Sequence, residues 1–388
     1  MYAGASAVPD GGLFRAARFR DVHLYQGFAH SVFDGAVPYR DFFMEYPPGA
    51  LAVFLPPEVF GTSHYNAAFK ALMTLCGAVT IAVVAVLLAR FGVSRGRMYV
   101  ALALLALSPI ALGPIALNTY DAWPALLTVA ALLASPLAGF ALLGLAFAAK
   151  VYPIVLLPPA LALVWRTAGR RAAVLGAAAF GAVAAVVIAP FLVLAPHELA
   201  ESFRAQAGRS LQVESLGGSL LGVADRLGWY DATVVHRTGR TISYDVVGSL
   251  PDALALVSSV AQAGVVLLAL WLYLRGRDDV ARLSVAFAAA IAGFLAFTRF
   301  FSPQYLVWLI PFVVLLQPLE WMLAAVALVL AQIWFFHYTD VFSLGGYIWL
   351  VAVRDLLVAA LFVVLCLRAV EDQHPVLFEH EAPVRVPA

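Results

Sequence analysis

Apolar residues occur along this chain in successive runs of about 15 to 25 residues, and short clusters of charged residues separate the runs. A helix needs roughly 20 apolar residues to cross the hydrocarbon core of a bilayer, so these runs are typical of transmembrane helices. The clearest runs cover residues 66–90, 98–117, 172–195, 251–274, 281–298, 303–317, 320–338 and 347–368. The pattern therefore predicts an all-α polytopic membrane protein.

Two apolar segments depart from this regular spacing. Residues 120–165 are apolar throughout but contain Ser-Pro at 135, Lys-Val-Tyr-Pro at 150 and Pro-Pro at 158, which indicates three short crossings. Residues 49–60 contain two prolines and are too short to span, so a re-entrant or interfacial segment is expected there. In total we expect a single bundle of about ten or eleven transmembrane helices.

Three compact basic clusters predict how the bundle is oriented. They consist of Arg90, Arg95 and Arg97; Arg166, Arg170 and Arg171; and Arg275, Arg277 and Arg282. The positive-inside rule places short loops rich in arginine in the cytoplasm. The predicted organisation is one domain of residues 1–388, divided into a first extracytoplasmic loop (1–65), transmembrane helices (66–195), a long extracytoplasmic loop (196–250), transmembrane helices (251–368) and a cytoplasmic tail (369–388). We expect this domain in the inner (plasma) membrane of a bacterium.

Composition agrees with the pattern and excludes several other classes of protein. The chain is 63% hydrophobic and 12% charged, whereas soluble domains are about half apolar and a quarter charged. The formal net charge of +1 gives no reason to expect nucleic acid as a partner. Cys76 and Cys366 lie alone in apolar runs and read as inert thiols. No HExxH, P-loop or GxSxG motif is present, so no cofactor is expected.

The first extracytoplasmic loop combines an amphipathic helix with a charged, proline-rich segment. The sequence DVHLYQGFAHSVFD, beginning at Asp21, places Val22, Tyr25 and Phe28 on one helical face. Asp21 can be the N-cap of this helix and nothing more, or a functional carboxylate. The sequence GAVPYRDFFMEYPPGA follows, and prolines there stiffen the segment that carries Tyr39, Arg40, Asp41, Glu45 and Tyr46.

Other charged residues are expected at the same membrane surface. Lys150 interrupts an apolar stretch, and an ionisable group inside the membrane costs about 2.5 to 3.5 kcal/mol, so Lys150 is either functional or snorkels from a helix end. Arg299 is either a ligand-binding group or an aromatic-belt anchor, and Asp121 is either functional or a helix cap. Arg209 is a further candidate cation for a phosphate, and the further candidates for substrate binding or loop positioning are Tyr25, Tyr152, Gln212, Glu214, Gln304 and Tyr305. Those in the loop after residue 208 can equally form a solvated loop face.

Two adjacent charges in the last apolar run, Arg354 and Asp355, are expected to point about 100° apart on a helix. Each should therefore pair with another helix. They are not assigned to the site.

Carboxylates from the first loop and cations from Lys150, Arg209 and Arg299 suit one kind of chemistry. Arginine and lysine can neutralise charge on a phosphate leaving group, and a carboxylate can take the proton of an acceptor hydroxyl. This combination favours sugar transfer from a lipid-linked phosphate sugar. A divalent ion held by Asp21, Asp41 and Glu45 is an alternative that we do not favour.

The order of DVHLYQGFAHSVFDGAVPYRDFFMEYPPGA, NTYDAWPALL, AAKVYPIVLLPPAL, RSLQVESLGGSLL and TRFFSPQYLVWLIPF resembles glycosyltransferase family 87 over roughly residues 21–311. The resemblance implies a GT-C-type helical bundle and a polyprenyl-phosphate-sugar-dependent glycosyltransferase of the actinobacterial mannosyl- or arabinosyltransferase type. It implies that Asp21 is the catalytic base and that Lys150, Arg209 and Arg299 lie near the donor phosphate.

The start of the chain departs from the family pattern, which has an apolar helix just before the position of Asp21. Residues 1–19 are Gly-rich and show no h-region of a signal peptide. Either this polar segment crosses the membrane with the first span, or a first helix lies upstream of residue 1.

The expected function is an inverting transfer of a hexose, with mannose favoured, or of arabinose. The donor is a polyprenyl-phosphate sugar, and the acceptor is a glycolipid or polysaccharide of the cell envelope at the outer face of the membrane. Two other classes stay open. A transporter or lipid-linked sugar flippase would commonly show repeated halves, which this sequence lacks, and a scaffolding protein would bind the donor without turnover.

Overall fold

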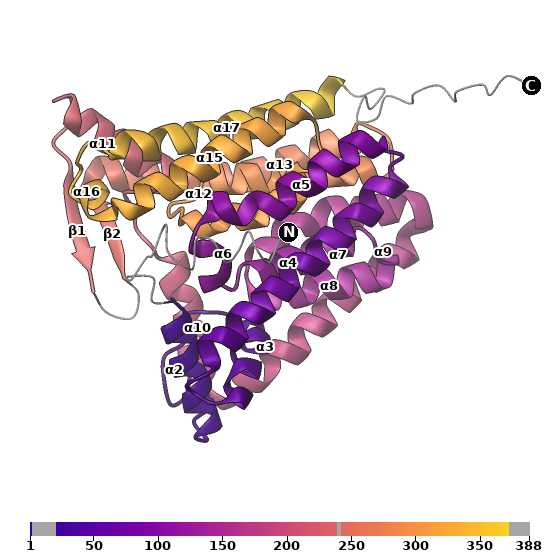
Figure 1. Cartoon of the computed structure of the whole chain (residues 1–388), viewed down its shortest axis with the longest axis horizontal. Coiled ribbons are helices and arrows are strands. Elements are labelled where there is room, and N and C mark those ends of the chain that lie inside the picture. Colours follow the sequence, from indigo (N-terminus) through magenta and orange to yellow (C-terminus); the bar gives the residue numbers. More distant parts are fainter. Residues whose placement is uncertain (2–20, 239–241, 372–388) are drawn as a thin grey trace, which may run out of the picture.

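The computed structural model of the chain describes residue 1 and residues 21–238 and 242–371. Almost all of the polar start (1–19) and of the predicted tail (369–388) therefore lies outside the described residues. The protein is an all-α polytopic membrane protein, as the hydrophobic pattern predicts. Two layers of helices meet at the right-hand end in Figure 1 and diverge toward the left, one toward α2 and the other toward α11.

The first layer is built from the first half of the chain. Its helices are α4 (Tyr65–Arg90), α7 (Ala122–Ala131), α8 (Pro136–Ala149) and α9 (Leu157–Leu194), with the short 3₁₀ helix η4 (Tyr152–Leu156) before α9. Between the two layers, α5 (Arg95–Leu112) contacts both α4 and α15 and is followed by the short α6 (Ile115–Asn118). The second layer contains α12 (Ser249–Leu274), α13 (Val280–Ala296), η5 (Pro303–Trp308), α14 (Ile310–Val313), α15 (Pro318–Phe336) and α17 (Ile348–Glu371).

The remaining elements gather at the diverging end of the two layers (Figure 1). They are α2 (Asp21–Phe33), η2 (Pro48–Ala50), α3 (Leu51–Phe54), η3 (Pro56–Phe60), α10 (Pro196–Ala207), α11 (Leu216–Arg226), β1 (Thr233–Arg237), β2 (Ser243–Val247) and α16 (Tyr338–Phe342). The run at residues 49–60 thus forms short helical pieces, because Pro47 and Pro48 precede it and Pro56 and Pro57 interrupt it.

Within residues 21–238 and 242–371, six segments are long and apolar enough to cross a membrane. They are 65–90, 95–112, 152–194, 249–274, 318–336 and 348–370. Shorter apolar helices cover residues 122–131, 136–149, 280–296 and 303–313, so the predicted count of ten or eleven crossings depends on them. Inside α9 the backbone leaves the helical conformation at Gly169 (φ 85°), between Arg166 and Arg170. This break separates the predicted 172–195 span from the short crossing before it.

Local sequence accounts for where several helices begin. Proline, whose missing N–H costs nothing in the first turn, opens α8, α10 and α15. The side chain of Asp279 accepts a hydrogen bond from the Arg282 backbone N–H (2.7 Å) and caps α13. Ser215 caps α11 in the same way through the Gly218 N–H (3.2 Å).

The core lies around α13, whose residues are almost all buried. This helix is rich in alanine, and small side chains let the neighbouring helices approach closely in a membrane bundle. It packs against α12 and α17 and also against η4 and α9. Val280 at the start of the helix and Phe294 near its end border two different cavities.

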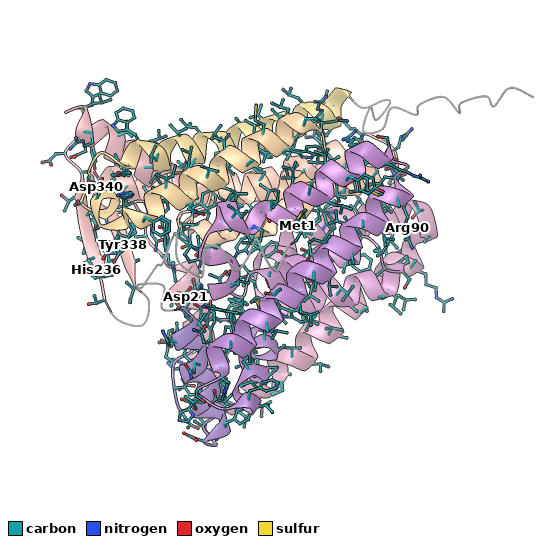
Figure 2. All side chains as sticks on the ribbon, viewed as in Figure 1. Met1, Asp21, Arg90, His236, Tyr338 and Asp340 are labelled. Carbon is teal, nitrogen blue, oxygen red and sulfur yellow. The ribbon has the colours of Figure 1, made fainter. Side chains whose placement is uncertain are left out.

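The basic clusters lie at the end of the bundle away from the long loops. Figure 2 shows Arg90 at the right-hand end, whereas Asp21, His236 and Asp340 lie toward the opposite end. Contacts between loops agree with this: Arg90 donates to the Leu133 carbonyl, and the Arg166 side chain pairs with Asp278. It stays a prediction that the end with the basic clusters faces the cytoplasm and that the end with the long loops faces the outer side of the membrane.

The hairpin of β1 and β2 within the long loop was not predicted. Its strands are antiparallel, with Val235 opposite Asp245. The Val213 N–H donates to the Tyr244 carbonyl (3.0 Å) and the Val246 N–H donates to the Leu211 carbonyl (2.9 Å), so residues 211–213 extend the pairing. The hairpin therefore fixes the segment that begins with Arg209.

Close backbone packing joins the first loop to the end of α8. A Cβ atom added at Gly49 would come within 2.5 Å of the Ala148 carbonyl carbon, so only glycine fits here without a shift. Since Lys150 follows directly after this contact, Gly49 also helps to set the position of that lysine.

We expect Gly49→Val to destabilise the protein by about 1 to 3 kcal/mol, because the added side chain must push α8 away from the first loop. The thermal unfolding midpoint of the purified protein in detergent measures this change. Gly27→Ala is the control, since the space around Gly27 is open and alanine favours the helix. Equal midpoints for Gly49→Val and the wild type would contradict the close packing.

Candidate active site

A cavity of about 550 Å³ lies between the first loop, α10, η4 and the segment that follows α13. It is at the diverging end of the bundle, where Figure 2 labels Asp21. Half of the site residues chosen from the sequence line it: Asp21, Glu45, Tyr46, Lys150, Tyr152, Arg209, Gln304 and Tyr305. The folded chain thus brings together residues from four separate segments of the sequence.

Asp21 is the first residue of α2 and borders the cavity. Burial raises the pKa of its carboxyl group to about 7, and the nearby carboxylates of Glu45 and Asp121 raise it further, whereas Lys150 and a hydrogen bond with Tyr25 oppose the rise. A carboxylate with this pKa can accept and release a proton near neutral pH.

Aromatic packing holds α2 over the cavity. The Tyr25 ring is buried and stacks on Phe54, with 4.2 Å between ring centroids. It also contacts the rings of Tyr46 and Tyr120 edge-on at 5.5 and 5.7 Å. Tyr25 therefore joins three segments of the site, in addition to its hydrogen bond with Asp21.

The floor of the cavity is formed by a buried ion pair. The Lys150 ammonium lies 2.6 Å from Asp121 Oδ1, and the same oxygen accepts a hydrogen bond from the Trp308 indole N–H (2.6 Å). The ammonium also lies over the rings of Tyr120, Tyr305 and Trp308, at 4.6 to 5.2 Å from their centroids.

This pair decides two alternatives that the sequence left open. Asp121 occupies the N-cap position of α7, but its side chain makes no capping hydrogen bond in the described structure. Lys150 does not snorkel to the surface, since its side chain is only 13% exposed. Asp121 Oδ2 is buried and has no hydrogen-bond partner among the described residues.

The second cation of the cavity, Arg209, has spare hydrogen-bonding capacity. Its NH2 group lies 3.4 Å from Glu45 Oε2 and its guanidinium packs on the Phe300 ring at 4.9 Å. Its Nε is buried without a hydrogen-bond partner in residues 21–238 and 242–371. Burial raises the pKa of Glu45, although Arg209 opposes this rise.

Helix α10 attaches the first loop to the rest of the site. Ser202 donates a hydrogen bond to the Met44 carbonyl (2.8 Å) and Gln206 donates to the Glu45 carbonyl (3.2 Å). These two bonds set the position of Glu45 opposite Arg209.

Some of the residues chosen from the sequence do not line the cavity. Arg299 turns away, and its NH2 group donates to the Ala207 carbonyl (2.5 Å) at the end of α10. Its own carbonyl accepts from the Gln212 N–H (2.9 Å), so Arg299 ties both ends of the segment that carries Arg209. The Gln212 side chain is buried beneath that segment.

Two exposed residues and one buried tyrosine of the first loop also lie outside the cavity lining. Arg40 and Asp41 pair with each other at 2.8 Å near the surface. Within the described residues, Asp41 does not line the cavity with Asp21 and Glu45, the two carboxylates with which it was considered as a site for a divalent ion. The Tyr39 hydroxyl donates to the Tyr46 carbonyl (2.6 Å) and so supports a residue that does line the cavity.

Behind the cavity, Arg354 of α17 joins two loops. Its guanidinium donates to the carbonyls of Phe301 (3.1 Å) and Glu214 (2.7 Å) and lies 4.1 Å from the centroid of the Phe301 ring. Glu214 in turn accepts a hydrogen bond from Ser302, which lines the cavity. Burial raises the pKa of Glu214, and Arg354 opposes that rise.

The prediction that Arg354 and Asp355 do not face each other is wrong. Arg354 Nε lies 2.8 Å from Asp355 Oδ1, which is an ion-pair distance, although neither atom makes a hydrogen bond among the described residues. The second carboxylate oxygen accepts a hydrogen bond from Ser219 of α11 (2.7 Å), so the expected contact with another helix also exists. The sequence signal for this cluster of Arg354, Asp355 and Ser219 was the presence of two charged residues inside an apolar run.

Sequence reasoning missed Tyr120 and Trp308, which surround Lys150, and Ser302 and Gln206. Neither aromatic residue was assigned a role from the sequence, and the aromatic-belt alternative was considered only for Arg299. Their role depends on which ring meets the ammonium, and spacing along the chain does not contain that information.

In the part of the chain that the structure describes, no three His, Cys, Asp or Glu side chains lie close enough to hold a metal ion. The cavity brings together a carboxyl group able to exchange a proton near neutral pH, a guanidinium with an unused N–H donor, and an ammonium whose charge Asp121 balances.

We expect Lys150→Met to destabilise the protein by about 3 to 5 kcal/mol, because it leaves the Asp121 carboxylate buried without its counter-charge. The double variant Lys150→Met/Asp121→Asn removes both charges and should recover most of this loss. Thermal unfolding of the two variants in detergent provides the comparison. If the double variant were as unstable as the single one, the ion pair would not be the cause.

Comparison with known families provides an independent result. The family model of glycosyltransferase family 87 matches residues 43–303, which is more than half of the chain. The matched range includes Glu45, Asp121, Lys150 and Arg209, whereas Asp21 precedes it. No curated protein matches the sequence.

Proposed function

We propose that this chain, which belongs to glycosyltransferase family 87, transfers a sugar from a polyprenyl-phosphate donor to an acceptor hydroxyl in the cavity bordered by Asp21 and Arg209. Membership of the family makes the protein a membrane glycosyltransferase. It also favours the enzyme over the transporter that the sequence left as an alternative. The donor, the acceptor and the role of each residue are our proposal.

One observation carries the proposal: a carboxyl group with a pKa of about 7 and a guanidinium with an unused N–H donor border the same cavity. Transfer from a glycosyl phosphate needs both functions. A base must take the proton of the acceptor, and a cation must stabilise the phosphate that leaves.

Arg209 is the proposed principal partner of the donor phosphate. Its buried Nε can donate to one phosphate oxygen, and its NH2 group can donate to a second oxygen after exchanging its long contact with Glu45. Lys150 is the second cation, but Asp121 already balances its charge. Arg299 has a positioning role, because it donates a hydrogen bond to the carbonyl of Ala207, two residues before Arg209.

Asp21 is the proposed general base. The acceptor oxygen forms a bond to the anomeric carbon while the bond from that carbon to the phosphate oxygen breaks, and the phosphate leaves with the electron pair. Asp21 takes the acceptor proton during this step, and attack from the side opposite to the phosphate inverts the anomeric configuration. Tyr25 stabilises the ionised form of Asp21 through its hydrogen bond.

The remaining lining residues suit an amphiphilic pair of substrates. Gln206, Ser302 and Gln304 offer hydrogen-bonding groups for sugar hydroxyls, whereas Phe28 and Phe43 form an apolar wall. We propose mannose or arabinose as the transferred sugar and a glycolipid or polysaccharide of the cell envelope as the acceptor. The cavity would then face the outer side of the inner membrane, in agreement with the positive-inside rule.

Asp21→Asn should lower the transfer rate by about 10²-fold or more, because the amide cannot accept the acceptor proton. The assay measures labelled mannose or arabinose moved from the corresponding polyprenyl-phosphate sugar in membranes that contain the variant. Asp34→Asn is the matched control, since Asp34 lies in the same loop and its side chain is 67% exposed. Wild-type activity in Asp21→Asn would exclude this residue as the base.

The pH profile provides a separate test. Because burial raises the pKa of Asp21 to about 7, the carboxyl group is mostly protonated at pH 5 to 6 and inactive as a base. We expect kcat/KM to fall about tenfold for each pH unit below this pKa and to level off above it. The low-pH fall should disappear in Asp21→Asn. A flat wild-type profile between pH 5 and 7 would disagree with the proposed base.

A further inference from the structure

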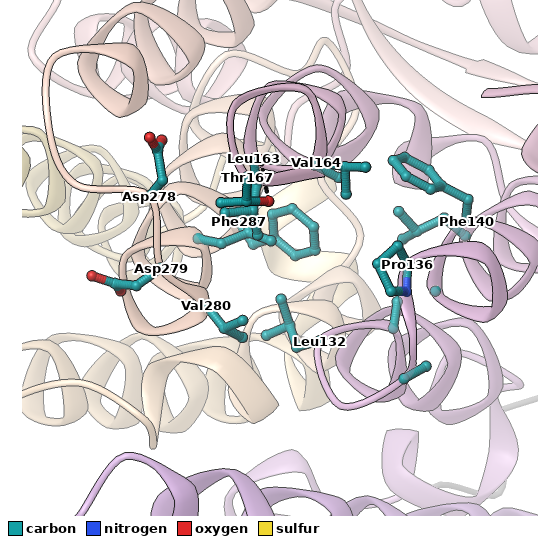
Figure 3. A pocket seen from close by; sticks show the side chains of 16 residues that line it. Leu132, Pro136, Phe140, Leu163, Val164, Thr167, Asp278, Asp279, Val280 and Phe287 are labelled. Carbon is teal, nitrogen blue, oxygen red and sulfur yellow. Dashed lines mark hydrogen bonds between the residues drawn. The ribbon is translucent and has the colours of Figure 1, made fainter. Parts of the chain in front are cut away.

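A second cavity of about 300 Å³ lies at the end of the bundle opposite to Asp21. Apolar side chains of α7, α8, α9 and α13 line it, among them Leu132, Phe140, Val164 and Phe287 (Figure 3). Its volume is at the lower end of the range of about 300 to 1,000 Å³ that is usual for ligand pockets.

The interior of this cavity offers a water molecule few hydrogen-bonding groups. The Thr167 hydroxyl already donates to the Leu163 carbonyl (2.8 Å). In Figure 3 the carboxylates of Asp278 and Asp279 point away from the apolar side chains. Cavities lined by carbon do not hold water stably, so the natural occupant within a membrane protein is a hydrocarbon chain.

Arginines hold each of the three loops at the mouth of the cavity. Arg90 donates to the carbonyl of Leu133, which lies between the lining residues Leu132 and Ala134. Arg166 pairs with the lining residue Asp278 at 3.0 Å, and Arg277 pairs with the lining residue Asp279 at 3.4 Å.

These arginines retain exposed surface and outnumber the acidic groups. The side chains of Arg166 and Arg277 are 37% and 56% exposed. Residue 90 and the loops 166–171 and 275–279 together contain six arginines but only two aspartates. The apolar cavity therefore opens beside a surface with an excess of positive charge.

We propose that this cavity binds one acyl chain of an anionic phospholipid, whose phosphate lies against Arg90, Arg166 and Arg277. Guanidinium groups bind phosphate through paired hydrogen bonds, and basic clusters next to transmembrane helices attract anionic lipid headgroups. The lipid would fill the space between α8, α9 and α13. This site is separate from the proposed active site, and its occupation does not depend on glycosyl transfer.

The test uses the full chain in detergent with phosphatidylglycerol and phosphatidylcholine that carry the same acyl chains, and native mass spectrometry counts the bound lipid. We expect one retained phosphatidylglycerol, preferred over phosphatidylcholine by at least about tenfold. Arg90→Gln should lower this preference several-fold. Arg95→Gln, an exposed arginine at the same end whose loop does not line the cavity, should leave it unchanged.

A pocket-filling variant examines the apolar part of the site. Val164→Trp should abolish retention of the lipid, and its thermal midpoint shows whether it folds. Equal retention of the two lipids by the wild type would overturn the proposal, whether or not this variant folds. Unchanged retention in folded Val164→Trp, or a polyprenyl lipid retained in place of phosphatidylglycerol, would overturn it as well.

Discussion

The buried pair of Lys150 and Asp121 is the interaction on which the rest of the site depends. Removing two charges from water is costly, so such a pair persists only when other groups surround it closely. Here Trp308 donates to the aspartate and three aromatic rings enclose the ammonium. These contacts join the start of α7 and the end of α8 to η5, which lies more than 150 residues further along the chain. The floor of the cavity depends on all three segments, because together they keep the pair out of water.

Burial and the balance of charge around this floor explain the unusual carboxyl group of the site. Among the described residues that line or underlie the cavity, the carboxylates of Asp21, Glu45 and Asp121 share this region with the two cations Lys150 and Arg209. Burial is the main reason that the pKa of Asp21 rises to about 7, and Lys150, which already pairs with Asp121, lowers it only in part. A base of this kind arises mainly from the burial of its carboxyl group, and the neighbouring carboxylates add to the effect. An incoming phosphate would compete with Glu45 for the same guanidinium.

Much of the fold and half of the candidate site follow from the sequence, because both rest on short-range patterns. Apolar runs and prolines locate most helices, and counting crossings predicts that the first loop, Lys150 and Arg209 share one end of the bundle. The sequence does not predict which group each charged side chain contacts. Arg299 is of a residue type suited to binding phosphate, but its side chain donates a hydrogen bond to the Ala207 carbonyl. Asp121 stands at the start of a helix, but its side chain does not cap that helix. Such choices depend on distances between segments that periodicity does not encode. The β1–β2 hairpin escaped prediction because its short strands lie in a loop with mixed polarity.

The position of Arg354 in α17 has a consequence for biosynthesis. This arginine holds the carbonyls of Phe301 and Glu214, and thereby the two loops that border the cavity beside Ser302 and Arg209. Because α17 is the final helix in the described part of the chain, the ribosome synthesises this anchor after every segment that lines the cavity. The loops must wait for α17 to enter the membrane before they reach their final geometry. The site is therefore completed only after α17 has been inserted, and a chain that stalls before α17 carries the residues of the site without their arrangement.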